Sequence, residues 1–145
     1  MLKKRERNVE EEVVEKPNTK KQATEVDDFK AFKISDPIAD KLKAKGIMSL
    51  FPIQKAVFEP LYSSKNVMAS ALTGSGKTLS FVLPLIQKCL DKDRMKHEAP
   101  LIMVIAPTRE LGIQISKVFS ELSTKELPFR VATIYGGVSI QDQSK

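Results

Sequence analysis

A short glycine-rich segment followed by lysine and threonine is the part of the sequence with the clearest chemistry. Residues 71–78 read Ala-Leu-Thr-Gly-Ser-Gly-Lys-Thr, with Ala71 where the strict phosphate-loop pattern has glycine. Gly74 and Gly76 permit backbone conformations in which successive amide N–H groups point into one concavity, which suits an anion. The Lys77 ammonium can reach the β- and γ-phosphates of a nucleotide, and the Thr78 hydroxyl can bind Mg²⁺. The segment therefore predicts a triphosphate site rather than a glycine-rich turn without chemistry.

Three further groups of residues have types suited to nucleotides or nucleic acid. The Gln54 amide can form two hydrogen bonds with the edge of adenine. Thr108 is a good helix N-cap, which leaves Arg109 beside the exposed amides of a first helical turn, a natural place for a phosphate. The pair Gly136-Gly137 lets the backbone approach a ligand closely. Taken one at a time, they are better explained as a surface amide, a capped helix and a turn.

Alternating apolar runs and helical patterns would position these residues. Three apolar runs, at 67–71, 101–106 and 131–135, are suited to buried strands, and helical spacing lies between them at 77–90 and 109–122. This order predicts crossovers on a parallel sheet with helices on its faces. The predicted fold class is α/β.

Prolines and a glycine mark the other helix boundaries. A helix is predicted over 36–44, because Pro37 suits its first turn and Gly46 fits just past its end. A second is predicted over 53–61. Pro84 falls inside the longest helix and predicts a kink there, or a first segment that ends near Val82.

Charge and composition narrow the classes of protein. Residues 1–28 hold seven basic and eight acidic side chains in short alternating blocks, so we expect a disordered charged tail there and a folded domain at 29–145. The net charge of +6 suits a polyanionic partner as well as an ordinary basic surface. Cys89 is the only cysteine, which excludes an internal disulfide and a cysteine-rich zinc site. No apolar stretch approaches ~18 residues and the first residues are charged, so we expect neither a membrane span nor a secretory signal.

In combination, the motifs resemble those of DEAD-box RNA helicases in order and spacing. The resemblance covers 29–145 and is carried by Phe29, Gly46, Phe51-Pro52-Ile53-Gln54, 71–78, 107–111 and Tyr135-Gly136-Gly137. The wording of residues 50–54 is most similar to the nucleolar subgroup known as Gu or RNA helicase II. This likeness implies a location in the nucleus, within the nucleolus, with the cytoplasm as the alternative.

The resemblance implies an ATP-dependent, ATP-hydrolysing RNA helicase that remodels RNA duplexes, and a RecA-like P-loop fold. ATP and Mg²⁺ are the implied cofactors, and RNA is the implied partner, bound through its backbone without sequence readout. Gln54 would read adenine while Phe29, 17 residues before Gly46, stacks on the base. The phosphates and the metal would be held by Thr73, Gly74, Ser75, Gly76, Lys77 and Thr78, with Lys77 and Thr78 as the catalytic pair and Thr78 as the Mg²⁺ ligand. The implied RNA contacts are Pro107, Thr108, Arg109, Gly136 and Gly137.

The sequence also departs from the family pattern. Leu50 and Ile47 stand where the family usually has proline and an aromatic residue, which bears on the adenine pocket. An Asp-Glu-Ala-Asp motif, a Ser-Ala-Thr motif and a second RecA-like domain do not occur within the 145 residues. The chain is therefore expected to be a fragment of the first RecA-like domain, inactive in isolation. One alternative is a non-catalytic ATP- or RNA-binding module. Another is a different P-loop enzyme such as a nucleotide kinase, but that alternative does not explain why Gln54, Arg109 and Gly137 occur together.

Overall fold

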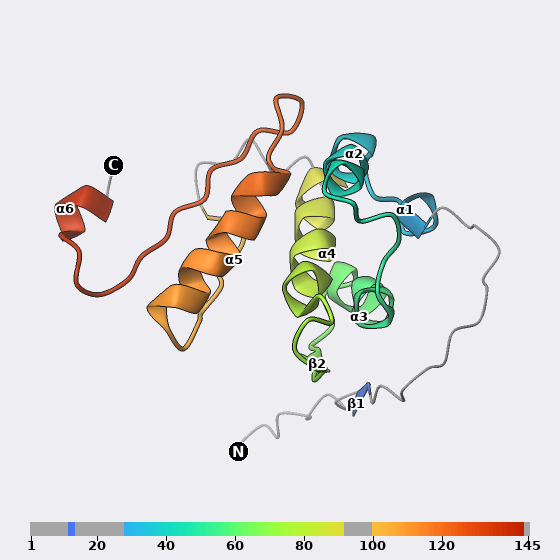
Figure 1. Ribbon diagram of the computed structural model, residues 1–145, viewed down its shortest axis with the longest axis horizontal. Coiled ribbons are helices and arrows are strands. Elements are labelled where there is room, and N and C mark those ends of the chain that lie inside the picture. The colour runs from blue at the N-terminus through green and yellow to red at the C-terminus, as the bar shows by residue number, and fades with distance from the viewer. Residues whose placement is uncertain (1–11, 14–27, 92–99, 144–145) are drawn as a thin grey trace, which may run out of the picture.

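The computed structural model describes residues 12–13, 28–91 and 100–143, and within them helices dominate (Figure 1). Most of the predicted tail at 1–28 lies outside these residues, as do residues 92–99. The elements in chain order are β1 (Glu12–Val13), α1 (Asp28–Ala31), α2 (Asp36–Ala44), α3 (Pro52–Tyr62), β2 (Met68–Ala69), α4 (Lys77–Asp91), α5 (Arg109–Leu122) and α6 (Ile140–Gln143).

Local signals set the ends of helix α2 as the sequence predicted. Pro37 lies in its first turn, and Gly46 follows its end with a φ of +77°. The N–H of Ile47 donates to the Leu42 carbonyl at 3.0 Å, and the N–H of Gly46 donates to that of Lys43 at 2.9 Å. This pair of bonds is a Schellman motif, which satisfies carbonyls that a helix end leaves unpaired.

Helix α4 continues through its proline. It runs from Lys77 to Asp91 with Pro84 inside, so the predicted end near Val82 is wrong. An interior proline costs about 3 kcal/mol. The cost is offset because Pro84 and its neighbours Val82, Leu83 and Ile86 are all buried in the core.

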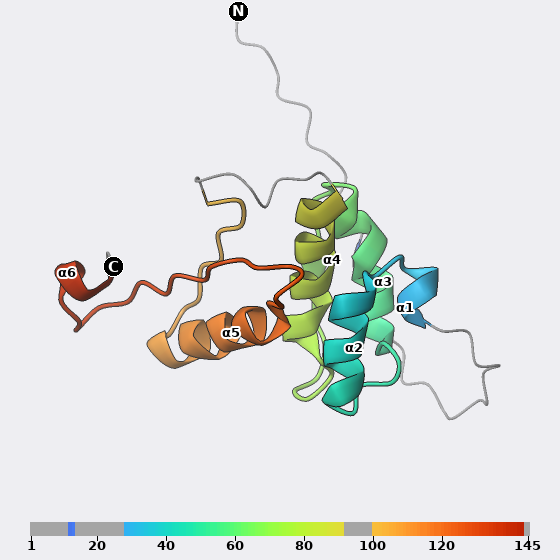
Figure 2. The ribbon, with the colours of Figure 1, turned by 90° about the horizontal axis from the view of Figure 1, so that it is seen from above.

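The core lies where α4 packs between α3 on one side and α5 on the other, with α1 and α2 closing it (Figures 1 and 2). Helix α6 stands apart from this bundle in both views, at the end of the chain segment that follows α5. The fully buried side chains come from each of the first five helices and include Phe29, Ile38, Ile53, Leu83 and Leu122.

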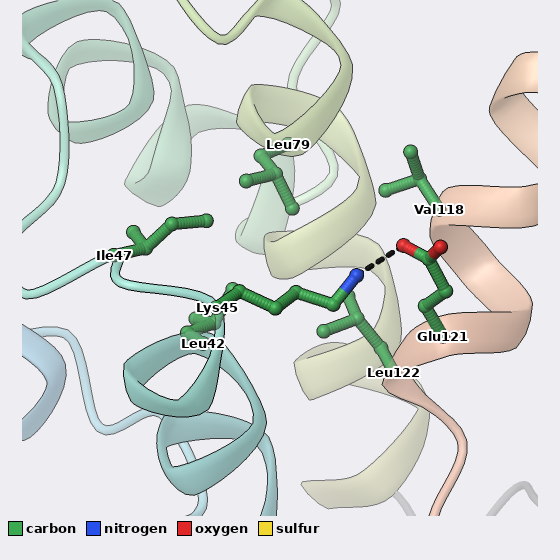
Figure 3. Close-up of a pocket in the computed structure, with 7 residues that line it drawn as sticks. All are labelled: Leu42, Lys45, Ile47, Leu79, Val118, Glu121 and Leu122. Atoms are coloured by element: carbon green, nitrogen blue, oxygen red, sulfur yellow. Dashed lines mark hydrogen bonds and ion pairs between the residues drawn. The ribbon is translucent and has the colours of Figure 1, made fainter.

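A small cleft of about 90 Å³ lies where α2, α4 and α5 meet (Figure 3). Its walls are mainly apolar and come from Leu42, Ile47, Leu79, Val118 and Leu122. The Lys45 ammonium, just past the end of α2, reaches across it and forms an ion pair with Glu121 of α5. This pair lowers the pKa of the Glu121 carboxyl below its usual value, chiefly through the hydrogen bond from Lys45. None of the predicted site residues lines the cleft.

The predicted three-stranded parallel sheet is not seen among the described residues. There β2 forms a two-residue parallel ladder with β1, while the runs at 101–106 and 131–135 are not strands. Met103, Ile105 and Ile134 are 83%, 88% and 82% exposed. An apolar run indicates a preference for burial, but a strand forms only where a second backbone offers a ladder of hydrogen bonds. The α/β prediction is therefore met for the helices and for part of the first strand only.

Candidate nucleotide and nucleic-acid site

The predicted phosphate loop lies between β2 and the first residue of α4, as its strand-to-helix setting requires. Gly74 and Gly76 have φ values of +81° and +79°, in the left-handed region that glycine alone adopts freely. The N–H of Ser75 donates to the Leu72 carbonyl at 3.3 Å, which closes the turn. The two glycines therefore have the conformations that the sequence predicted, and they shape a tight loop at the start of a helix.

Lys77 turns its side chain back onto this loop. Its ammonium donates to the carbonyl oxygens of Ala71 and Leu72, at 2.6 and 2.7 Å. The side chain is exposed, and Thr78 beside it is half-buried. The cation is therefore already held over the loop by two neutral acceptors, and an anionic oxygen at the same place would be a stronger acceptor.

Gln54 connects helix α3 to the phosphate loop. Its Nε2 donates to the carbonyl of Gly76 at 3.2 Å, and its Oε1 accepts from the N–H of Phe51 at 2.9 Å. The residue is only 2% exposed. A Cβ added at Gly76 would lie 2.3 Å from Nε2 of Gln54 and 2.9 Å from Cδ2 of Phe51, so the contact requires glycine at this position.

Asp28 fixes the start of helix α3, which carries Gln54. Its Oδ2 accepts from the N–H of Leu50 at 3.0 Å, and its Oδ1 forms an ion pair with Lys55 at 2.8 Å. The Asp28 side chain is only 12% exposed. One carboxylate therefore joins α1 to Leu50, just before α3, and to Lys55 within it.

Phe29 lies in the core rather than beside the loop. It is 1% exposed, and the Lys43 ammonium lies 5.6 Å from the centroid of its ring. Of the two residues that the resemblance assigns to adenine, the structure brings Gln54 to the phosphate loop, while Phe29 packs in the hydrophobic cluster. Stacking of a base on Phe29 stays a prediction, and it would require the ring to become exposed.

The residues predicted to contact RNA come from two separate segments that meet in space. Thr108 caps α5, because its Oγ1 accepts from the N–H of Leu111 at 3.3 Å. The Arg109 guanidinium lies over the ring of Tyr135, with Cζ 4.4 Å from the ring centroid. A Cβ added at Gly137 would lie 3.9 Å from Nη1 of Arg109.

The surface formed by Arg109, Tyr135 and Gly137 is thus built from the start of α5 and from a turn about 26 residues later. Pro107 and Gly136 are exposed beside it. The sequence analysis placed Arg109 and Gly137 in one group and used Tyr135 for the resemblance, but it assigned Tyr135 no role in the site. The available signal was an aromatic residue directly before two glycines, but the same pattern is typical of the end of a strand.

The polar groups of the loop suit a bound nucleotide. The Ser75 Oγ is buried and has no hydrogen-bond partner among the described residues, although a buried hydroxyl normally has one. The donors available are backbone amides at a helix start, one ammonium and three hydroxyls, a set that suits phosphate oxygens and a hard cation. The residues present therefore fit ATP phosphates, with Thr78 as the candidate oxygen ligand for Mg²⁺.

Most of the chain matches a known protein family. The sequence pattern of the family described as DEAD/DEAH box helicase matches residues 51–145. The chain belongs to the DEAD/DEAH box helicase family. This confirms the resemblance seen in the motifs and excludes the alternative of a nucleotide kinase.

Curated relatives of the chain include "Nucleolar RNA helicase 2" of Rattus norvegicus, 46% identical over 111 residues, which cover 75% of this chain and 14% of the relative. "ATP-dependent RNA helicase DDX50" of Homo sapiens is 42% identical over 117 residues, 79% of this chain and 16% of the relative. The chain thus spans only about a seventh of the length of these DEAD-box relatives.

Solved structures of DEAD-box proteins have a similar fold. The RNA-helicase Prp28 from Chaetomium thermophilum, solved bound to ADP, matches with a TM-score of 0.67 and 31% identity over 78% of this chain and 28% of that one. A DEAD box protein from Methanococcus jannaschii matches with a TM-score of 0.63 and 32% identity over 80% of this chain and 31% of the other. Within the described residues, no helix of this chain has the length and apolar character needed to cross a membrane.

Proposed function

We propose that the protein to which this chain belongs is an ATP-dependent RNA helicase, and that this chain supplies part of its first RecA-like domain, at 29–145. The observation that carries the proposal is the phosphate loop, with Gly74 and Gly76 in left-handed conformations and the Lys77 ammonium held over it. Family membership and relatives named as RNA helicases support the same activity.

In this proposal the chain binds and orients the nucleotide. Lys77 would exchange the Ala71 and Leu72 carbonyls for phosphate oxygens, the loop amides would bind further oxygens, and Thr73 and Ser75 would add hydroxyls. Thr78 would help hold Mg²⁺, which would neutralise charge between the phosphates. Phosphoryl transfer depends mainly on such positioning and charge stabilisation. Gln54 would sense adenine through the N–H of its amide that is not committed to Gly76, and Phe29 would stack on the base.

The RNA backbone would bind at Pro107, Thr108, Arg109, Gly136 and Gly137. Arg109 supplies a cation and the glycines allow close approach of a phosphate. Because such contacts do not read bases, binding would not depend on RNA sequence. Relatives named as nucleolar support a location in the nucleolus, which imaging of a tagged full-length protein would test.

Substitution of Lys77 tests the proposal. A lysine–phosphate pair at about 4 Å is worth about 4 kcal/mol at an effective dielectric of 20, before desolvation. Allowing about 1–2 kcal/mol for desolvation and for the two carbonyl bonds already present, Lys77→Ala in the full-length protein should weaken Mg²⁺-ADP binding about 30- to 150-fold. RNA-stimulated ATP turnover should be lost as well.

Lys88→Ala is the matched control, because Lys88 lies near the other end of α4, where it donates to Ser64. The control should bind nucleotide and hydrolyse ATP as the wild type does. Undiminished RNA-stimulated turnover in the Lys77→Ala variant would overturn the proposed function.

A further inference from the structure

A single glutamine side chain closes the turn that follows the third apolar run. The Oε1 of Gln143 accepts from the N–H of Tyr135 at 2.8 Å. Its Nε2 donates to the carbonyls of Tyr135 and Val138, each at 3.1 Å. The side-chain amide therefore bonds only to the backbone of one short segment, and it binds both the N–H and the carbonyl of Tyr135.

The segment that Gln143 closes is the one that carries Gly136-Gly137. Gly137 has a φ of +84°, a conformation that a free chain visits only part of the time. The N–H of Gln143 also donates to the Ser139 carbonyl at 3.3 Å, so side chain and backbone together fold residues 135–143 back on themselves.

Tyr135 in turn restricts the position of the Arg109 side chain. Its ring lies under the guanidinium, with Cζ 4.4 Å from the centroid, well within the range of a cation–π contact. A guanidinium that stacks on a ring keeps its N–H edge available for a phosphate, and it loses less freedom on binding than a free arginine. Arg109 comes from α5, so the stack also joins the turn to the helix bundle.

We propose that Gln143 and Tyr135 are positioning residues that hold Arg109 and the Gly136-Gly137 backbone together as one preformed surface for RNA phosphates. Gln143 fixes the backbone on either side of Tyr135, and the Tyr135 ring fixes the guanidinium. Neither residue needs to contact RNA itself. The inference rests on the proposed function, since it concerns the affinity of the same RNA surface.

The experiment measures binding of a fluorescent single-stranded oligouridylate and of Mg²⁺-ADP to variants of the full-length protein. Gln143→Leu removes all three side-chain bonds, and Gln143→Glu keeps the acceptor for the Tyr135 N–H but lacks both donors. We expect about three- to tenfold weaker RNA binding for Gln143→Leu, a loss at least as large for Gln143→Glu, whose second carboxylate oxygen would face the Tyr135 and Val138 carbonyls, and unchanged ADP binding. Gln114→Leu, at an exposed position of α5, is the matched control and should bind RNA normally.

Tyr135 is tested separately, so the result does not depend on one variant. Tyr135→Leu removes the ring under Arg109 and should weaken RNA binding about three- to tenfold, while Tyr135→Phe keeps the ring and should restore it. In steady-state ATP turnover the KM for RNA should rise with kcat unchanged. The slope of log affinity against log salt should fall by up to about one unit, because one arginine–phosphate contact is weakened.

Hydrogen exchange provides a readout at the proposed contact. The Tyr135 amide should exchange faster in Gln143→Leu than in the wild type, since its acceptor is gone. If the wild type binds RNA and both Gln143→Leu and Tyr135→Leu bind it equally well, the inference is wrong while the proposed function stands. If ADP binding falls as much as RNA binding, the residues are merely structural and the inference is also overturned. A wild type without RNA affinity would refute both.

Discussion

Substitution of the two loop glycines by alanine gives a sharp test of how the phosphate loop is held. Both residues have left-handed φ values, near +80°, which cost a residue with a side chain about 1–2 kcal/mol. Around Gly74 there is nothing within 4 Å of an added Cβ, so Gly74→Ala bears only this backbone cost. At Gly76 the added Cβ would lie 2.3 Å from Nε2 of Gln54 and 2.9 Å from Cδ2 of Phe51.

The clash makes Gly76→Ala the more costly change. Gln54 must move away, and the bond from its Nε2 to the Gly76 carbonyl is lost, which adds about 0.5–1.5 kcal/mol. We therefore expect Mg²⁺-ADP to bind about 5- to 30-fold more weakly to Gly74→Ala, and about two- to tenfold more weakly again to Gly76→Ala. Isothermal titration calorimetry on the full-length protein measures both losses.

Truncation of Gln54 separates the clash from the backbone cost. In a Gln54→Ala background, Nε2, the atom nearest to the added Cβ at Gly76, is absent. The difference in Mg²⁺-ADP affinity between Gly74→Ala and Gly76→Ala should therefore shrink to the part that the clash with Phe51 causes. Equal losses in the two glycine variants, or a gap that Gln54→Ala leaves unchanged, would refute the reasoning that Gln54 packs against the loop.

Two further predictions concern the helix bundle. Leu42→Ala, at a position with 0% exposure beside the cleft in Figure 3, should lower the free energy of unfolding by about 2–5 kcal/mol in urea titrations. Met48→Ala, 70% exposed, should change it by less than about 0.5 kcal/mol, and a loss under about 1 kcal/mol for Leu42→Ala would contradict the packing. Lys45→Met should raise the pKa of Glu121 toward its ordinary value, because the hydrogen bond from Lys45 is the main cause of its lowering. The stability that this pair contributes is present above the pKa of an unfolded glutamate, and it is lost as the pH falls through the lowered pKa of the folded state. An NMR titration gives the pKa of the Glu121 carboxyl in both proteins. The same pKa in the wild type and in Lys45→Met would exclude a contribution from the pair.

Helix ends were predictable because their signals are local. Helices α2 and α5 have the predicted bounds of 36–44 and 109–122, since Pro37, Gly46 and Thr108 each act within a few residues of where they stand. The strands at 101–106 and 131–135 were not found, because their formation depends on a distant backbone that no spacing along the chain specifies.

In the candidate site, too, local features were predictable from the sequence and contacts between distant residues were not. The glycine conformations of the phosphate loop follow from residue type, and the structure has them. The bond from Gln54 to Gly76 and the three bonds of Gln143 join side chains to backbone atoms, and a glutamine in a sequence does not reveal which carbonyl it will meet. The predicted contacts of Gln54 with adenine, of Thr78 with Mg²⁺ and of Arg109 with RNA stay predictions.

Pro84 gives helix α4 a mechanical property. Proline has no N–H, so the Ser80 carbonyl lacks its usual partner one turn along, and the axis bends most easily between these two residues. The short arm starts at Lys77, while the long arm ends at Asp91, whose carboxylate accepts from the Tyr62 hydroxyl at 2.6 Å. A tilt of the first turn at Lys77 can therefore be taken up by bending between Ser80 and Pro84, while the end of α4 at Asp91 keeps its place.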